Sequence, residues 1–388
     1  RVYGLGGRDF YVEDALELFR QGFDSSPQSF DYLGQHPGDP NLNPKPYFAP
    51  VTAQETSLGA TVCQIQDGTV TAKGGNVRET TKMPKRLAPG HGACPGCGIP
   101  VNINLLLRGI EGNVVLLFHT GCGMVVTAPY PKTAFKVPFI HNLFQNGPAT
   151  LSGLIEMYRQ RMARGELSNQ ELTFIMVSGD GGMDIGMGSA IGTAVRDVPF
   201  ILLEYDNGGY MNTGYQLSYS TPKGAKSSTS HVGKTQYGKQ FFHKDTPQIM
   251  AATGIPYVAT AAESHPADFI QKAAKAQYFA RQGGMAYLNA LSACPLNWGD
   301  APNKERSVIG AAVDCCYFPL YEVQHGKTAL SYNPEDKGKK TPVLDWLSMM
   351  GRTKHLAGEQ YAPIVQDIQQ EVDRRWERLK ARAQSELL

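Results

Sequence analysis

Leu172-Thr-Phe-Ile-Met-Val-Ser178-Gly179-Asp180-Gly181-Gly182 runs from an apolar segment into a glycine-rich turn that holds an aspartate. Similar apolar segments, rich in β-branched or aromatic residues, occur at Val114–His119, Val198–Tyr205 and Met285–Ser292. Short apolar runs separated by helical-looking stretches are typical of buried strands in parallel sheets. We therefore predict an α/β fold with a mostly parallel, doubly wound sheet and helices on both faces.

Polar or thiol side chains follow each of these four segments. They are Cys122, Asp180, the pair Asp206-Asn207, and Cys294. In open parallel sheets, ligands bind in the crevice at the carboxyl ends of the strands. The sequence therefore predicts that these side chains face one pocket.

The composition excludes several classes of protein. The chain has 388 residues, with 37 basic and 35 acidic ones, so its net charge of +2 indicates neither nucleic-acid binding nor binding to an anionic membrane. No apolar run approaches the roughly 18 residues of a membrane span, and no signal-peptide pattern opens the chain. Seven cysteines, some spaced as metal ligands, indicate a reducing compartment. We predict a cytoplasmic protein.

The chain divides into three predicted parts. Residues 1–86 are expected to form an N-terminal helix, at Val12–Arg20, and an extended proline-rich arm, with weak strand signals only near Thr61–Ile65. Residues 87–330 are the compact α/β domain. Residues 331–388 form a C-terminal extension with an amphipathic helix, indicated by an apolar stripe at Ile364, Ile368, Val372, Trp376, Leu379 and Ala383.

The turn Gly179-Asp180-Gly181 has the features of a phosphate site. Glycines let backbone N–H groups approach a pyrophosphate, and the amino end of the following helix, expected over Asp184–Val195, favours an anion. Asp180 could hold Mg²⁺, with further oxygen ligands from the Asn207 side chain and a backbone carbonyl near Gly209. Taken by itself, a Gly-Asp-Gly turn also suits an ordinary strand-to-helix connection.

The cysteines suggest a second metal site. Cys94-Pro-Gly-Cys97 lies in a loop rich in glycine and proline, and Cys122 and Cys294 stand at strand ends. Four thiolates suit a 4Fe–4S cluster or a zinc ion, so the count leaves the metal open. Cys315-Cys316 competes for the fourth ligand position, but adjacent cysteines after an apolar run favour buried packing. Cys63 is expected to be inert.

Further residues identify a family. Gly179-Asp180-Gly181 with Asp206-Asn207 resembles the diphosphate-binding motif of thiamine diphosphate enzymes. The block Tyr210-Met-Asn-Thr-Gly214, followed by Ser218 and Thr221-Pro222, resembles the thiamine-binding beta subunit of the 2-oxoacid:ferredoxin oxidoreductases, the pyruvate synthase family. The match is good from about Leu87 to Trp298. It implies the thiamine diphosphate-binding fold.

The resemblance also assigns roles to residues. It implies that Asp180, Asn207 and Gly209 bind Mg²⁺ and that Asn212 attends the reacting carbon as a catalytic residue. The residues implied to contact thiamine diphosphate are Gly179, Asp180, Gly181, Asn207, Gly209, Thr213 and His141. From composition alone, His141 suits a hydrogen-bonded core histidine better, and Asn212 also suits a residue that stabilises a turn.

For the cysteines, the resemblance implies iron and sulfur instead of zinc. It places a proximal 4Fe–4S cluster on Cys94, Cys97, Cys122 and Cys294. Coenzyme A is the implied co-substrate, and lysines in the loop after Thr221 either meet its phosphates or are simply solvated; these are Lys223, Lys226 and Lys234. The chain departs from the family pattern at Leu217-Ser218 and Gln145-Asn146, which leaves the substrate in doubt.

The implied function is CoA-dependent oxidative decarboxylation of a 2-oxoacid to acyl-CoA and CO₂, with pyruvate as the default and aryl or other 2-oxoacids as alternatives. A second, pyrimidine-binding alpha-type subunit must complete the active site, and a ferredoxin-like subunit and ferredoxin or another acceptor must carry the electrons. Two other functions stay open: a non-redox thiamine lyase or synthase subunit with structural zinc, and a non-catalytic Fe–S electron-transfer subunit.

Overall fold

The computed structural model describes most of the chain after residue 60, namely residues 61–66, 68–128, 133–167 and 171–385. It also describes the backbone of two short antiparallel strands, β1 (Val2–Tyr3) and β2 (Asp9–Phe10). The predicted helix at Val12–Arg20 and the proline-rich arm that follows it lie outside the described residues.

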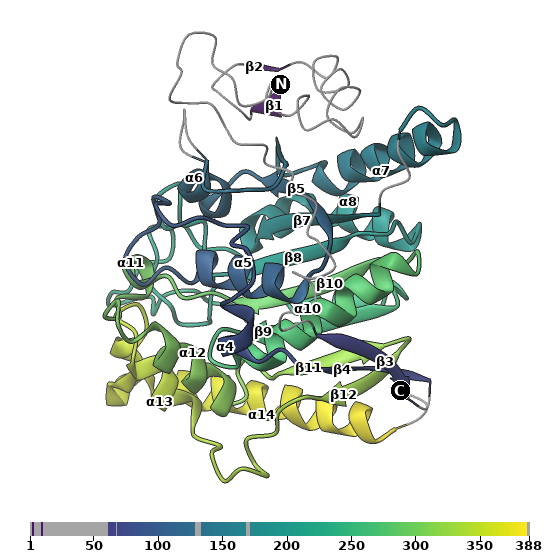
Figure 1. The fold of residues 1–388 in the computed structure, drawn as a ribbon. Helices are drawn as coiled ribbons and strands as arrows, with labels where there is room; N and C mark the ends of the chain where they lie inside the picture. Colours follow the sequence, from purple (N-terminus) through teal and green to yellow (C-terminus); the bar gives the residue numbers. More distant parts are fainter. Residues whose placement is uncertain are drawn as a thin grey trace.

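An eight-stranded sheet in the order β12-β11-β9-β10-β8-β7-β5-β6 forms the centre of the molecule (Figure 1). Strands β5 to β10 pair in parallel, whereas β11 pairs antiparallel with both β9 and β12. In chain order the strands are β5 (Asn113–His119), β6 (Phe139–Asn142), β7 (Leu172–Gly179), β8 (Ile201–Asp206), β9 (Tyr257–Ala262), β10 (Ala286–Leu291), β11 (Tyr321–Gln324) and β12 (Lys327–Leu330).

The four strands predicted from apolar runs are present as β5, β7, β8 and β10. The largest difference is at β8, which begins at Ile201 and not at Val198. Pro199 lies between these positions, and a proline has no N–H group for the strand ladder. The apolar content of the run therefore located the strand, and the proline set where it starts.

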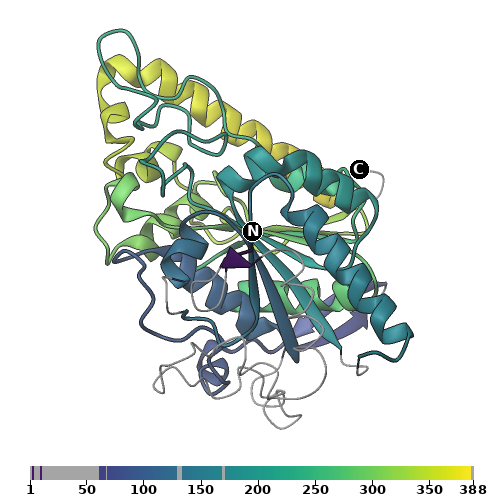
Figure 2. The ribbon, with the colours of Figure 1, turned by 90° about the horizontal axis from the view of Figure 1, so that it is seen from above.

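Helices cover both faces of the sheet, as Figure 2 shows. They are α4 (Val77–Thr80), α5 (Gly98–Gly109), α6 (Cys122–Thr127), α7 (Gly147–Ala163), α8 (Asp180–Val195), α9 (Thr246–Ala251), α10 (Pro266–Arg281), α11 (Pro295–Trp298), α12 (Glu305–Asp314), α13 (Val343–Ser348) and α14 (Ala362–Gln384), with 3₁₀ turns η2 (Lys354–Ala357) and η3 (Glu359–Tyr361). Helices α5 and α10 share one buried cluster, and α7, α8 and α12 to α14 share the other.

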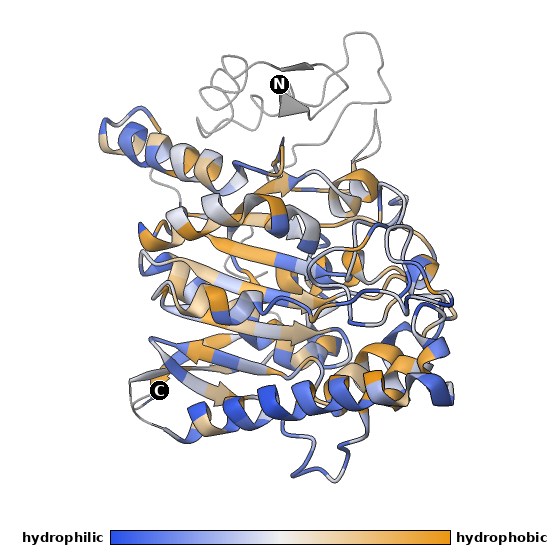
Figure 3. Ribbon diagram, turned by 180° about the vertical axis from the view of Figure 1, so that it is seen from behind, coloured by the Kyte–Doolittle hydropathy of each residue, from blue (hydrophilic) through white to orange (hydrophobic). Residues whose placement is uncertain are grey.

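Strand β5 is apolar along most of its length because both of its faces are buried. Val114, Leu116 and Phe118 pack into the cluster with α5 and α10, while Val115 and Leu117 pack into the opposite cluster. Successive side chains of a strand point to opposite faces, so a strand covered on both faces has no solvent side. Figure 3 shows the apolar colouring along the central strands and the largely polar surface of α14. The predicted fold class is confirmed.

The segment before the domain contains more structure than its weak signals indicated. Strands β3 (Val62–Gln66) and β4 (Thr69–Lys73) form an antiparallel hairpin. The side chain of Gln324 on β11 donates to the Val70 carbonyl at 3.0 Å and accepts from the Val70 N–H at 2.9 Å. Because these partners are so distant in sequence, local propensity gave little sign of the pairing.

The predicted C-terminal helix is α14. Ile368, Val372, Trp376 and Leu379 from its apolar stripe are buried against the domain. No helix in the described part of the chain has both the length and the apolarity that crossing a membrane requires.

Candidate functional site

The carboxyl ends of β7, β8 and β10 meet at one edge of the sheet. In the parallel ladder, Gly179 pairs with Tyr205, and Leu291 pairs with Asp206. The segments that continue from these strands, carrying Asp180, Asn207 and Cys294, therefore start at the same level. The sequence predicted this arrangement from the strand pattern.

A tight turn leads from β7 into α8 and requires glycine. A Cβ atom at Gly179 would come within 2.9 Å of the Tyr205 ring, and one at Gly181 would overlap the ring of Tyr210. Helix α8 begins at Asp180, earlier than the predicted start at Asp184. An acidic residue in the first helical turn is favoured by the helix dipole. The first N–H groups of the helix lack partners within it, so this end suits a phosphate.

Three oxygen-bearing groups converge beside the turn. One terminal atom of the Asn207 amide lies 3.0 Å from Asp180 Oδ1 and 3.1 Å from the Gly209 carbonyl oxygen. If this atom is the nitrogen, it donates to both; if it is the oxygen, three oxygens face one another. Octahedral Mg²⁺ has oxygen ligands at about 2.0–2.1 Å, which places neighbouring ligands roughly 3 Å apart. This donor set fits Mg²⁺.

The carboxyl of Asp180 is buried among other negative groups. It is 1% exposed, and its Oδ2 accepts from the Gly209 N–H at 2.9 Å and from Ser218 Oγ at 2.5 Å. Burial, and then the charge of Asp206, raise the pKa of Asp180 well above its ordinary value. A bound cation would offset both effects.

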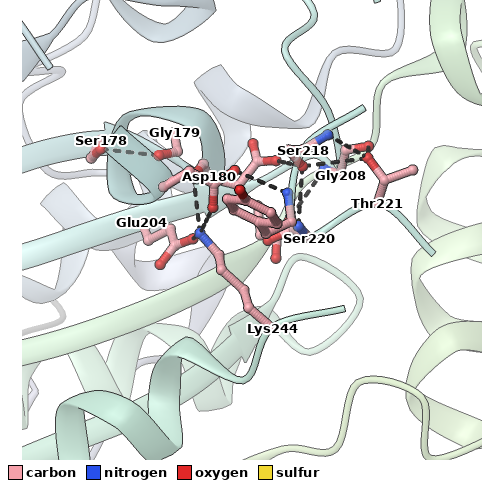
Figure 4. A network of polar contacts seen from close by, with 12 residues as sticks. Ser178, Gly179, Asp180, Glu204, Gly208, Ser218, Ser220, Thr221 and Lys244 are labelled. Atoms are coloured by element: carbon pink, nitrogen blue, oxygen red, sulfur yellow. Dashed lines mark hydrogen bonds and ion pairs between the residues drawn. The ribbon is translucent and has the colours of Figure 1, made fainter. Parts of the chain in front are cut away.

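Lys244 links the acidic groups of this edge (Figure 4). Its Nζ donates to the Asp180 backbone carbonyl at 2.9 Å and to Asp184 Oδ1 at 2.6 Å, and it lies 3.2 Å from Glu204 Oε1. Burial by itself would lower the pKa of Lys244, but the charges of Glu204 and Asp184 raise it above the ordinary value. Lys244 is therefore the buried cation that holds these carboxylates together.

Glu204 and Lys244 were not identified by sequence reasoning. Glu204 stands in the middle of the apolar strand β8, is fully buried, and accepts from Tyr287 Oη at 2.5 Å. Burial raises its pKa to about 7. A charged residue inside an apolar strand indicates a buried functional or paired group, so the sequence pattern could have identified Glu204. No such pattern marks Lys244, because it lies in an irregular polar loop.

The loop that carries the predicted catalytic residue lies at the surface of the chain. Asn212 and Thr213 are exposed. The Tyr210 N–H donates to the Gln216 carbonyl at 2.9 Å, which closes the loop, and Thr213 Oγ1 donates to Gln216 Oε1 at 2.5 Å. Asn212 is thus presented outward by a tight turn.

The two histidines near this edge differ in their contacts. His141, on β6, is 8% exposed, and its Nε2 lies 2.7 Å from Thr120 Oγ1. His119, at the end of β5, is fully buried with Nδ1 2.9 Å from Ser178 Oγ. Burial, with a smaller effect from His141, lowers the pKa of His119 to about 3, so its ring is neutral. Contact of His141 with a cofactor remains a prediction.

The four predicted cluster cysteines lie on neighbouring segments. Cys97 immediately precedes α5, Cys122 begins α6, and Cys294 immediately precedes α11. The Cys97 N–H donates to the Cys94 carbonyl at 3.0 Å, and the Gly98 N–H donates to the Ala293 carbonyl at 3.0 Å. The second bond ties the Cys-x-x-Cys loop to the segment of Cys294.

The thiols also affect one another electrostatically. Burial, and then the nearby thiols of Cys294 and Cys97, raise the pKa of Cys122 to about 12. Burial is likewise the main cause that raises the pKa of Cys97 to about 12. Among the described residues, no three His, Cys, Asp or Glu side chains are arranged so as to hold a metal ion. The mutual electrostatic effects and the bond between Gly98 and Ala293 make these cysteines neighbours, and their ligation of a metal remains a prediction.

Two aromatic residues connect the two predicted sites. The Tyr205 hydroxyl accepts from the Gly123 N–H at 3.0 Å, beside Cys122, while its ring packs against Gly179. Trp298 Nε1 donates to the Asn207 carbonyl at 2.8 Å. The turn at Asp180 and the cysteine segments are therefore side by side.

The burial predicted for Cys315 and Cys316 is confirmed, whereas the inertness predicted for Cys63 remains a prediction. Cys315 and Cys316 are 0% and 3% exposed within the core. Cys63 lies on β3 of the hairpin, partly buried.

The lysines of the loop after Thr221 differ in their contacts. Lys223 is paired with Asp367 of α14 and lies 4.4 Å from the centre of the Phe242 ring. Lys226 and Lys234 are exposed.

Comparison with known proteins defines the class of protein first. Residues 122–290 match the family model described as thiamine pyrophosphate enzyme, C-terminal TPP binding domain. This segment includes the turn at Asp180 and the loop of Asn212. Together with the fold, the match indicates the class of thiamine diphosphate-binding domains.

Curated relatives then define the family. A pyruvate synthase subunit PorB of Methanothermobacter marburgensis is 40% identical over 290 residues, 74% of this chain and 96% of the relative. The PorB subunit of Thermotoga maritima is 38% identical, over 78% of this chain and 93% of the relative. A ketoisovalerate oxidoreductase subunit VorB of Pyrococcus furiosus is 30% identical, over 80% and 97%.

The chain therefore belongs to the family of thiamine diphosphate-binding subunits of the 2-oxoacid:acceptor oxidoreductases, as its motifs predicted. It is one subunit of an oxidoreductase complex.

Replacing Lys244 tests the buried charge network. In Lys244→Met, Asp184 and Glu204 lose their buried cation, so we expect the free energy of unfolding to fall by about 3–5 kcal/mol at pH 7. The loss should be smaller at pH 5, where a buried Glu204 with a raised pKa is protonated in the folded state and no longer needs a cation. Urea unfolding measures both values.

Lys226→Met is the matched control, because Lys226 is exposed in a nearby loop. Its effect should stay within about 0.5 kcal/mol. Equal losses in the two variants would contradict a structural role for Lys244.

Proposed function

We propose that this chain binds thiamine diphosphate with Mg²⁺ and a 4Fe–4S cluster at adjacent sites. With its partner subunits it then catalyses the CoA-dependent oxidative decarboxylation of a 2-oxoacid, releasing acyl-CoA, CO₂ and two electrons. The observation that carries the proposal is the convergence of Asp180, Asn207 and Gly209 beside the helix end, with Trp298 joining this group to the segment of Cys294. Family membership supports the reaction type.

Different residues of this chain are proposed to bind Mg²⁺ and the diphosphate. Asp180, Asn207 and the Gly209 carbonyl would hold Mg²⁺, while Gly179, Gly181 and the N–H groups of α8 would receive the diphosphate. Thiamine diphosphate, when bound, supplies the carbanion chemistry that releases CO₂. The protein contributes placement and a fixed electrostatic environment.

Asn212 is proposed to contact the substrate at the reacting carbon. It is exposed in this chain together with Thr213, so a partner must cover the site to exclude water. We propose that this partner is the pyrimidine-binding alpha-type subunit, and that a ferredoxin-like subunit receives the electrons on their way to ferredoxin or another acceptor. Lys226 and Lys234 remain available to the phosphates of coenzyme A, whereas Lys223 is already paired.

Cys94, Cys97, Cys122 and Cys294 are proposed to ligate the cluster, which supplies one-electron redox chemistry. In support, Cys97, Cys122 and Cys294 are partly buried at or just before helix starts, and a hydrogen bond ties the Cys-x-x-Cys loop to the segment of Cys294. Burial raises the pKa of Cys97 and of Cys122 to about 12, so these two thiols would release their protons on ligation at neutral pH.

Replacing Asp180 tests the magnesium site. We expect Asp180→Ala to retain thiamine diphosphate more than roughly 100-fold more weakly, because a ligand of the metal is lost. The visible spectrum of the cluster should be unchanged, since Asp180 is not one of its ligands. The measurement is thiamine diphosphate per chain after gel filtration in Mg²⁺.

Asp345→Ala is the control for this change, because Asp345 is an exposed carboxylate on α13. Full retention of the cofactor by Asp180→Ala would refute the metal assignment.

Replacing individual cysteines tests the cluster. Cys294→Ser should lose most of the iron and the visible absorbance of the anaerobically purified complex, whereas Cys316→Ser should keep both, because Cys316 is a buried core residue. Metal analysis and absorption spectroscopy measure the effects. The reverse ranking would transfer the fourth ligand to Cys316, and zinc in place of iron would favour a structural site.

We propose pyruvate as the substrate, because the relatives at 38–40% identity are named pyruvate synthase subunits, against 30% for the ketoisovalerate relative. Assayed with coenzyme A and an artificial electron acceptor, the complex should turn over pyruvate faster than 2-oxoglutarate, branched-chain or aryl 2-oxoacids. A higher kcat/KM for one of these would replace pyruvate.

A further inference from the structure

An arginine from the C-terminal region is buried between the two sites. Arg352, which follows α13, is only 4% exposed. Its Nη1 donates to the Gly208 carbonyl at 3.0 Å and to Asn297 Oδ1 at 3.3 Å. A buried charge is costly unless its surroundings compensate for it. The two hydrogen bonds to neutral acceptors offset only part of the cost of burying the guanidinium charge, so nearby aromatic and negatively charged groups must contribute as well.

Arg352 acts together with Trp298. The guanidinium carbon lies 4.5 Å from the centre of the Trp298 ring. The backbone N–H of Arg352 donates to the Trp298 carbonyl at 3.1 Å. Trp298 is fully buried and holds the Asn207 carbonyl through its indole N–H. The stacked pair therefore donates hydrogen bonds to the carbonyls of two consecutive residues, Trp298 to Asn207 and Arg352 to Gly208.

The backbone at this point needs such support. Gly208 has a φ of +65°, a conformation in which most residues are strained. The Asn207 side chain and the Gly209 carbonyl, on either side of Gly208, are the proposed magnesium ligands. A shift of these peptide planes would misplace both.

The charge of Arg352 also faces the cysteine segment. Burial lowers its pKa to about 10, so the guanidinium stays protonated at neutral pH. The described groups that act on it electrostatically include Tyr317, Cys294, Asp206 and Asp180. The Tyr317 hydroxyl and the Cys294 thiol have raised pKa values and are neutral at pH 7. Arg352 is thus a fixed positive charge that contacts Asn297 in the segment after Cys294 and lies near the carboxylates of Asp180 and Asp206.

We propose that Arg352 is a positioning residue for both sites: with Trp298 it fixes the Asn207–Gly208 carbonyls, and its charge stabilises the reduced form of the cluster beside Cys294. The second part rests on the proposed function, because it requires a cluster at that cysteine. Reduction adds one electron and hence one negative charge to the cluster. A nearby fixed positive charge therefore raises the reduction potential.

Three variants separate the two roles. Arg352→Met removes the charge and the hydrogen bonds. Arg352→Lys keeps the charge but loses the planar fork that stacks on the indole. Trp298→Phe keeps an aromatic ring but loses the bond to the Asn207 carbonyl. Arg378→Met is the matched control, because Arg378 is an exposed arginine on α14.

The measurements use the intact complex, purified anaerobically. Iron per chain is determined first, and the reduction potential follows from a dithionite titration monitored by electron paramagnetic resonance. Thiamine diphosphate retention is measured after gel filtration in Mg²⁺. Hydrogen exchange of the peptide containing residues 206–209, after removal of thiamine diphosphate, reports the positioning of the loop without the cofactor.

We expect Arg352→Met to lower the potential, to weaken thiamine diphosphate retention roughly 10- to 100-fold and to speed exchange of the loop. Arg352→Lys and Trp298→Phe should weaken retention and speed exchange while the potential stays close to that of the wild type. Arg378→Met should change none of these quantities.

An unchanged potential in Arg352→Met would overturn the electrostatic role, and unchanged exchange and retention in Arg352→Lys and Trp298→Phe would overturn the positioning role. If Arg352→Met fails to fold, a lowered potential in Arg352→Lys would likewise contradict the charge argument. A wild-type complex without iron would instead refute the proposed cluster, which separates that failure from failure of the loop-positioning role.

Discussion

The burial of the Asp180 carboxyl at the start of α8 is the constraint on which the site depends. Burial, and then the charges of Asp206 and Asp184, oppose its ionisation and raise its pKa. The fold compensates with hydrogen bonds to the carboxylate and with the buried ammonium of Lys244. The pKa of Asp180 stays raised in spite of these contacts, and the proposed Mg²⁺ would be a further compensating charge.

The same arrangement explains why the two predicted sites are neighbours. In a parallel sheet the carboxyl ends of neighbouring strands lie at the same edge. The turn after β7 and the Cys294 segment after β10 therefore lie close together, with only β8 between these strands. The Tyr205 ring packs against Gly179 while its hydroxyl accepts from the Gly123 N–H beside Cys122, and Trp298, in the segment after Cys294, donates to the Asn207 carbonyl. Tight packing at this point would hold the proposed cofactor and the proposed cluster close together.

The C-terminal extension takes part in the site. Its helix α14 pairs through Asp367 with Lys223 of the active-site loop, and the segment before it inserts Arg352 behind Gly208. The opposite side of the site is open, with Asn212 and Thr213 exposed. The proposed partner subunit would cover this open side, and the chain belongs to a family whose members are subunits of complexes.

The sequence by itself determined the α/β fold class, the four main strands and the family, because apolar runs covered on both faces and the spacing of Gly179-Asp180-Gly181 and Asn207 are local patterns. It also located the residues at the sheet edge, since strand ends are read from composition. Only the tertiary structure decided that Lys244 neutralises Glu204, that Gln324 anchors the hairpin, and that Arg352 lies between the sites. These contacts join segments far apart in the chain, and their strength depends on burial. A local sequence pattern cannot predict which distant residues will be buried together.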